Sequence, residues 1–104
     1  MAGKASIEFN FRKAVSQAER LDQAADQLNR LSNNQFGNIM QGLAANWRGE
    51  NASLYLDKGG RLQRQMDGTA KELHHIASDI RRIAKRLYDA EMEALRIAQK
   101  RDYR

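Results

Sequence analysis

The second half of the chain carries an apolar pattern that leaves little choice of fold. Between Tyr55 and Ile97, apolar or small residues recur at alternating steps of three and four, for about six heptads. This spacing places them in one row along a helix, because an α-helix has about 3.6 residues per turn. No proline interrupts the pattern. It therefore predicts one long helix over about residues 51–100.

The first half shows the same spacing with weaker helix-forming residues. From Phe11 to Leu43 the apolar and small positions again step by three or four, and Asn10 is a suitable N-cap just before them. The pattern predicts a helix over about residues 11–45. Residues 33–38, with the sequence NNQFGN, have poor helix propensity, so we expect the helix to be strained or kinked there.

The connection between these two helices is short, which fixes their relative direction. Residues 46–50 suffice to join antiparallel helices but not parallel ones. We therefore predict an all-α fold, an antiparallel two-helix hairpin that forms a single domain over residues 1–104. Gly49 suits a turn because glycine adopts positive φ without steric cost. Asn51 or Ser53 would cap the second helix.

Two rows of side chains would form the core of this hairpin. The larger row predicts a seam that packs within the chain or across a dimer; it comprises Leu21, Leu28, Leu62, Met66, Leu73, Ile76, Ile80, Ile83 and Leu87. A second row of small side chains would let a neighbouring helix approach closely; it comprises Ala70, Ala77 and Ala84. The single tryptophan, Trp47, would close the open end of the seam near Leu43 and Leu54.

The lengths of the two helices predict a second chain. At about 1.5 Å per residue they span about 50 Å and about 75 Å. Counting back from the turn places residue 11 opposite about residue 86, so residues 88–104 would overhang without a first-helix partner. The apolar spacing nevertheless continues there. Because a lone hairpin also leaves apolar edges uncovered, we predict a dimer, homomeric or heteromeric, built as a four-helix bundle.

Several kinds of chemistry are absent from the sequence. The chain has no cysteine, and its only histidines, His74 and His75, are adjacent and so point about 100° apart on a helix. We expect Glu91 and Glu93 to lie in a charged helix end without a pocket, and no Gly-rich phosphate loop or nucleophilic serine motif occurs. We therefore expect no enzyme, no metal, no cofactor and no small-molecule substrate.

The sequence also limits the routes across a membrane. The N-terminal residues lack the apolar stretch of a secretory signal peptide, and no apolar run of 18 residues occurs anywhere. We expect no membrane span. If the protein leaves the cell, it does so by a route that is independent of a signal peptide.

The position of the tryptophan motif suggests such a route. Trp47-Arg48-Gly49 stands midway between two long helices in a chain of 104 residues, and the first helix opens near the sequence IEFNF, residues 7–11. In these features the chain resembles the WXG family of type VII secretion substrates, which are relatives of the early secreted antigenic target (ESAT) proteins. The resemblance covers the whole chain in length and architecture.

The resemblance implies a small protein that leaves the cytoplasm folded and becomes extracellular through a bacterial type VII (ESX or Ess) system and its membrane ATPase. It implies a homodimer, or a heterodimer with another WXG-family protein or with an effector such as an LXG toxin. In the family, the Trp-x-Gly turn, here Trp47 and Gly49, acts with a C-terminal Tyr-x-x-x-Asp/Glu signal that is often on the partner.

The C-terminal signal departs from the family pattern in this chain. Tyr88 is the well-placed tyrosine, but the residue four positions later is Met92, with Glu91 and Glu93 on either side. On a helix Glu91 lies about 60° from Tyr88 and Glu93 about 140°. Glu91 is therefore the better substitute by geometry. Either the signal is degenerate or a partner chain carries it.

The sequence is also compatible with two other classes of function. The basic cluster Arg81, Arg82, Lys85 and Arg86 would suit a nucleic-acid-binding helix, and the second half of the chain supplies four of the five net positive charges. Acidic residues interleave with this cluster and no aromatic side chains accompany the arginines, so we do not expect nucleic acid as the partner. The third class is a purely structural coiled-coil protein.

Overall fold

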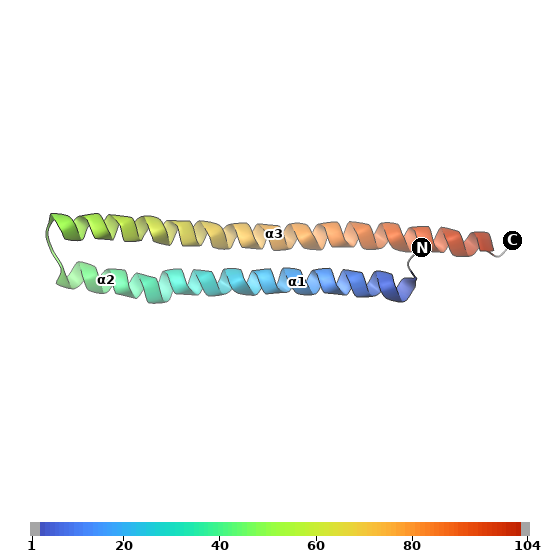
Figure 1. The fold of residues 1–104 in the computed structure, drawn as a ribbon, viewed down its shortest axis with the longest axis horizontal. Coiled ribbons are helices and arrows are strands. Elements are labelled where there is room, and N and C mark those ends of the chain that lie inside the picture. Colours follow the sequence, from blue (N-terminus) through green and yellow to red (C-terminus); the bar gives the residue numbers. More distant parts are fainter. Residues whose placement is uncertain (1–2, 103–104) are drawn as a thin grey trace. The chain divides into compact units, whose positions relative to one another are not determined.

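The computed structural model describes residues 3–102, all of which are helical except residue 3 and residues 47–49. The elements, in order, are α1 (Lys4–Arg30), the π-helical segment η1 (Leu31–Phe36), α2 (Gly37–Asn46) and α3 (Glu50–Asp102). The first three follow one another without a break and pair with α3 (Figure 1). No strand occurs among the described residues. The prediction of an all-α chain built on a long helix pair is confirmed.

The helix pair divides into two compact units. One unit is residues 22–74, in which α3 follows α2 through a short connection; the other combines the residues up to 21 with those from 75 onward. In each unit a stretch of the first helical run contacts a stretch of α3. Ser32 bonds to Gln63 in one unit, and Phe11 packs on Tyr88 in the other.

The first helix begins at Lys4 and not near residue 11, so the predicted start is wrong. The backbone N–H of Ile7 donates to the carbonyl of Gly3 at 3.0 Å, which places Gly3 and not Asn10 ahead of the first turn. The extension has a physical cause, because Ile7 is only 2% exposed and continues the buried face of α1. The alternation of apolar and polar residues in IEFNF obscures this helical spacing in the sequence.

The connection between α2 and α3 is shorter than predicted. Its three residues are 47–49, and Gly49 has φ +114°, a region that other residues adopt only with strain. The carbonyl of Gly49 accepts the N–H of Ser53 at 3.1 Å. Gly49 therefore precedes the first turn of α3, and the predicted caps, Asn51 and Ser53, lie inside that helix. Glu50 at the helix start has the charge that suits an N-terminal dipole.

The irregularity predicted at residues 33–38 overlaps η1, the π-helical segment Leu31–Phe36, in which backbone hydrogen bonds span one residue more than in an α-helix. Ser32 is fully buried within it. Its hydroxyl donates to the backbone carbonyl of Gln63 at 3.3 Å, and the Gln63 side-chain amide donates to the Ser32 carbonyl at 3.0 Å. These two bonds join η1 to α3. A polar pair in an otherwise apolar contact fixes the register of two helices, because slipping would leave its groups unsatisfied.

Apart from Ile7, small side chains form the interior of the helix pair. The buried residues are Ile7, Ala18, Ala25, Ser32, Ala52, Ala70, Ala77 and Ala84. Alanines on facing helices let the backbones approach closely, since no branched side chain separates them. The predicted row of small residues on α3 is thus where the helices meet.

The larger predicted seam lies to the side of this alanine row. Its members on α1, together with Met66, Leu73 and Ile80, are half-buried. The remaining four are 46% to 58% exposed; they are Leu62, Ile76, Ile83 and Leu87. We expected Ile76 and Ile83 to be buried against the first helix. The buried row of α3 instead lies one residue further along the chain, at Ala77 and Ala84.

Candidate functional site

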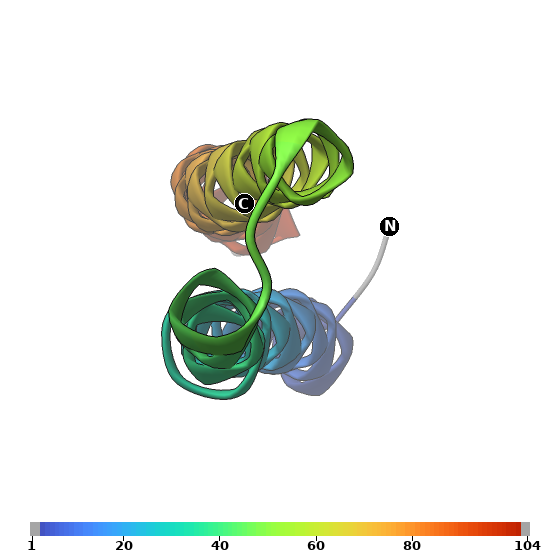
Figure 2. The ribbon, with the colours of Figure 1, turned by 90° about the vertical axis from the view of Figure 1, so that its left-hand side faces the viewer.

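The connection between α2 and α3 presents an aromatic pair. Figure 2, which looks onto this end of the chain, shows the connection crossing between the two helices. Trp47 has extended backbone angles, and its ring stacks on Tyr55 with the centroids 5.5 Å apart and the planes 22° from parallel. The Lys58 ammonium lies 5.7 Å from the centre of the Tyr55 ring. Cation, tyrosine and tryptophan thus form one cluster beside the turn.

This aromatic pair remains open to solvent. Trp47 is 40% exposed and Tyr55 is 56% exposed. We predicted that the Trp47 ring closes the apolar seam near Leu43 and Leu54; its ring partner is Tyr55, and Leu54 is itself exposed. An aromatic side chain that is supported on one face and open on the other is suited to contact a second molecule.

At the other end of the first helix, Tyr88 packs against α1. Its ring centroid lies 4.9 Å from that of Phe11, and the Lys85 ammonium lies 5.3 Å from the centre of the Tyr88 ring. We predicted that α3 has no partner helix from residue 88 onward, and this prediction is wrong for the first residues of that range. Because α1 begins at Lys4, the side chain of Lys4 still lines a groove together with Leu95 and Gln99 of α3.

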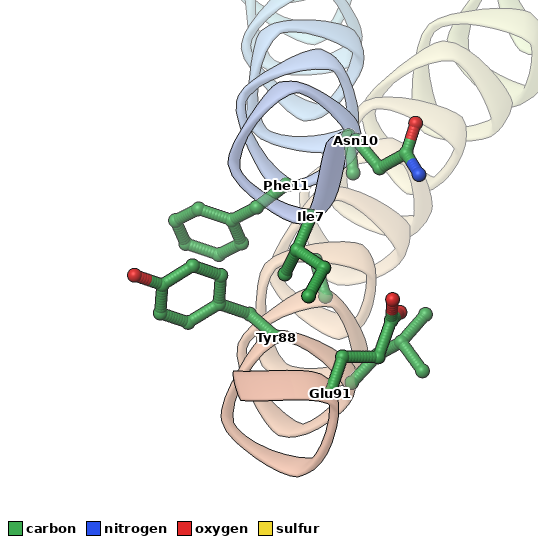
Figure 3. A pocket seen from close by; sticks show the side chains of 8 residues that line it. Ile7, Asn10, Phe11, Tyr88 and Glu91 are labelled. Atoms are coloured by element: carbon green, nitrogen blue, oxygen red, sulfur yellow. The ribbon is translucent and has the colours of Figure 1, made fainter. Parts of the chain in front are cut away.

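A small apolar pocket of about 60 Å³ lies at this junction. Figure 3 shows Ile7 between Tyr88 and Glu91, with Phe11 on the tyrosine side and Asn10 on the glutamate side. The lining residues are Ile7, Asn10, Phe11, Ala14, Ala84, Leu87, Tyr88 and Glu91.

The two glutamates that flank Met92 have different surroundings. Glu91 is half-buried and lines the pocket beside Tyr88. Glu93 is exposed and accepts hydrogen bonds from Arg96, with Oε2 2.9 Å from Nε. That hydrogen bond, together with the charge of Arg96, lowers the pKa of Glu93. The structure therefore brings Glu91, and not Glu93, together with Tyr88.

An exposed apolar row lies on α3 in the same unit. We define it by Ile76, Ile83 and Leu87, which are 47%, 58% and 56% exposed. Their spacings of seven and four residues place them on one face of the helix. The unit formed by residues 22–74 also exposes large apolar side chains, among them Ile39 and Leu62. Large apolar side chains that recur on one exposed helix face are suited to pack against another helix.

The basic cluster on α3 is largely paired with acidic groups. Arg81 lies 3.6 Å from Glu19 on α1, and Arg82 lies 3.0 Å from Asp79. Lys85 lies 2.9 Å from Asp89. Since these carboxylates compete with phosphate for the same cations, the arrangement disfavours a phosphate-binding surface.

Two further observations concern metal binding and membrane insertion. Within residues 3–102, no cluster of three or more histidine or acidic side chains has the geometry to hold a metal ion. No helix among these residues is both long enough and apolar enough to pass through a bilayer.

One cluster was not predicted from the sequence. His74 of α3 lies between Asp22 and Asp26 of α1. The sequence does contain the information that predicts this cluster. Asp22 and Asp26 are one helical turn apart, so they lie on the same face of α1. Counting residues back from the turn, which places residue 11 opposite about residue 86, also places residue 22 opposite about residue 75.

Comparisons of the chain with known protein families, with curated proteins and with solved structures find no match.

Proposed function

We propose that this chain is a small non-enzymatic protein of bacterial type VII (ESX or Ess) secretion, which is exported itself or directs a partner to the export machinery. The observation that carries the proposal is the composition of the connection between α2 and α3. Trp47, Arg48 and Gly49 make up the whole of it, Gly49 has the positive φ of a tight turn, and Trp47 remains 40% exposed. The Trp-x-Gly motif is thus displayed on the surface, as an export signal requires.

A second element of the proposed signal lies at the far end of α1. Tyr88 and Glu91 lie on opposite sides of Ile7 around one small pocket, while Glu93 is engaged by Arg96 (Figure 3). We assign the role of the C-terminal signal to Tyr88 with Glu91. A partner chain that carries its own Tyr-x-x-x-Asp/Glu sequence would replace this pair.

The exposed apolar row supports pairing with another helical chain. Ile76, Ile83 and Leu87 present apolar surface that a single helix pair leaves in water. Covering it with a second hairpin gives a four-helix bundle, either as a homodimer or with a WXG-family or LXG-type partner. The secretion ATPase would then recognise the assembled pair in the cytoplasm, before the pair is released outside the cell.

An export assay with matched variants of the connection tests the proposal. Trp47→Ala removes the exposed ring, whereas Arg48→Ala changes its neighbour in the same connection. We expect both variants to keep a wild-type helical signal by circular dichroism, and only Trp47→Ala to lose most of its export from a type VII-competent host. Equal export of both variants at the wild-type level would contradict the proposed role of Trp47.

A further inference from the structure

His74 occupies an unusual position for a partly exposed histidine, because both of its ring nitrogens face carboxylates. Nδ1 lies 2.6 Å from Oδ1 of Asp22, and Nε2 lies 3.2 Å from Oδ1 of Asp26. The two aspartates are one turn apart on α1, while His74 belongs to α3. The imidazole therefore bridges two helices within the unit formed by residues 22–74.

The protonation state decides how many of these contacts are favourable. A neutral imidazole has one N–H donor, so only one aspartate can receive a hydrogen bond and the second faces a nitrogen lone pair. An imidazolium has two N–H donors and a positive charge, so it satisfies both carboxylates at once. The geometry around His74 is complementary to the charged ring.

Other charged groups near this site come from both helices. On α3, Lys71 lies one turn before His74 and opposes its protonation, whereas Asp67 lies two turns before it and contributes another carboxyl group. One oxygen of Asp67 is buried and has no hydrogen-bond partner among the described residues. On α1, Arg30 lies one turn beyond Asp26. The two groups in direct contact with the imidazole are both acidic.

We infer that Asp22, Asp26 and His74 form an acid-tightened clasp, which holds α1 to α3 in residues 22–74 most firmly when the imidazole is protonated. The hydrogen bond to Asp22 raises the pKa of His74 above its ordinary value; desolvation opposes this, and the charges of both aspartates add to it. Export plays no part in this inference, so it stands or falls separately from the proposed function.

The direction of the pH effect follows from the raised pKa of His74. A group whose pKa is higher in the folded than in the unfolded state stabilises the fold fully below its unfolded pKa, which is about 6.5 for histidine. The stabilisation is lost as the pH rises through the folded-state pKa of His74. Lowering the pH from mildly alkaline to mildly acidic values therefore tightens the clasp, down to the range where the aspartates themselves become protonated.

Two measurements on the full chain test the clasp. The first is urea unfolding, followed by circular dichroism between pH 5 and pH 9 at one fixed protein concentration. His74→Gln removes the bridging ring, while His75→Gln removes the adjacent ring, which has no hydrogen bond or ion pair among the described residues. We expect the wild type and His75→Gln to lose stability relative to His74→Gln as the pH rises. Parallel pH profiles for all three proteins would overturn the inference.

The second measurement follows the His74 ring directly by NMR, in proteins that keep the wild-type helical signal by circular dichroism. We expect the titration midpoint of His74 to fall when Asp22→Asn and Asp26→Asn are introduced together, because both carboxylates that favour the imidazolium are then gone. A midpoint that is the same with and without the aspartates would also overturn the inference.

Discussion

At the scale of single residues, one contact shows how tightly parts of this helix pair are fitted. Gly59 of α3 faces Met40 of α2, and a Cβ added to Gly59 would overlap the Sδ and Cε atoms of that methionine. A glycine inside a helix normally weakens it, since glycine loses the most backbone freedom on folding. Here the absence of a side chain is what makes room for Met40.

This contact leads to a prediction about three glycines of α3. An added Cβ at Gly68 has nothing within 4 Å, so Gly68→Ala should raise the free energy of unfolding by about 0.5–1 kcal/mol. Gly59→Ala should be less stable than Gly68→Ala by up to about 1 kcal/mol, because the flexible end of the Met40 side chain must move. Gly60→Ala, where a Cβ meets only the end of the Arg64 side chain, should resemble Gly68→Ala. Urea unfolding monitored by circular dichroism gives all three values.

A double variant separates packing from helix propensity. Adding Met40→Ala to Gly59→Ala removes the overlap. Met40→Ala should therefore lower the free energy of unfolding less in the Gly59→Ala protein than in the wild type. If the Gly59→Ala and Gly68→Ala proteins are equally stable, the Met40 contact does not constrain the fold.

At the scale of the elements, the heptad spacing of α3 predicts the helix itself but not which face meets α1. Large apolar residues and alanines occupy neighbouring rows, and hydrophobicity alone favours burying the larger ones. The structure buries Ala77 and Ala84 and leaves Ile76 and Ile83 exposed. Close approach of two backbones decides this, and it depends on the opposite helix, where Ala18 and Ala25 complete the contact.

The start of α1 and the caps of α3 were mispredicted for a related reason. Local cap residues such as Asn10 and Asn51 indicate helix ends only when tertiary contacts do not extend the helix past them. Burial of Ile7 extends α1, and the bond from Ser53 to the carbonyl of Gly49 moves the start of α3. The poor helix propensity of residues 33–38, by contrast, is a local property, and η1 is present nearby as predicted.

The exposed apolar row of α3 gives a prediction at this scale. Ile83→Glu places a charge in the middle of the row, so association with a second chain should weaken at least tenfold, while the helical content stays unchanged. Ser78→Glu introduces the same charge at another exposed position of α3 and serves as the control. Sedimentation over a range of concentrations measures the association. Unchanged association of Ile83→Glu, or no association of the wild type, would contradict the proposed pairing through this row.

At the scale of the whole molecule, the sequence provides the proposed signal but not the way in which it is displayed. Trp47-Arg48-Gly49 and Tyr88 are visible in the sequence, and Glu91 follows from helix geometry. The stacking of Trp47 on Tyr55 depends on how the chain turns between α2 and α3, and the packing of Tyr88 on Phe11 depends on a contact between residues far apart along the chain. The proposed export function therefore depends on surfaces that only the paired helices create.

The most direct test of this function is the dependence of export on the secretion ATPase. The wild-type chain, with an epitope tag, is expressed in its native host with and without a functional type VII ATPase gene, and the culture medium and the cells are compared. We predict that the chain disappears from the medium and accumulates in cells that lack the ATPase, and that restoring the gene restores export. Equal amounts in the medium of both strains would contradict the account.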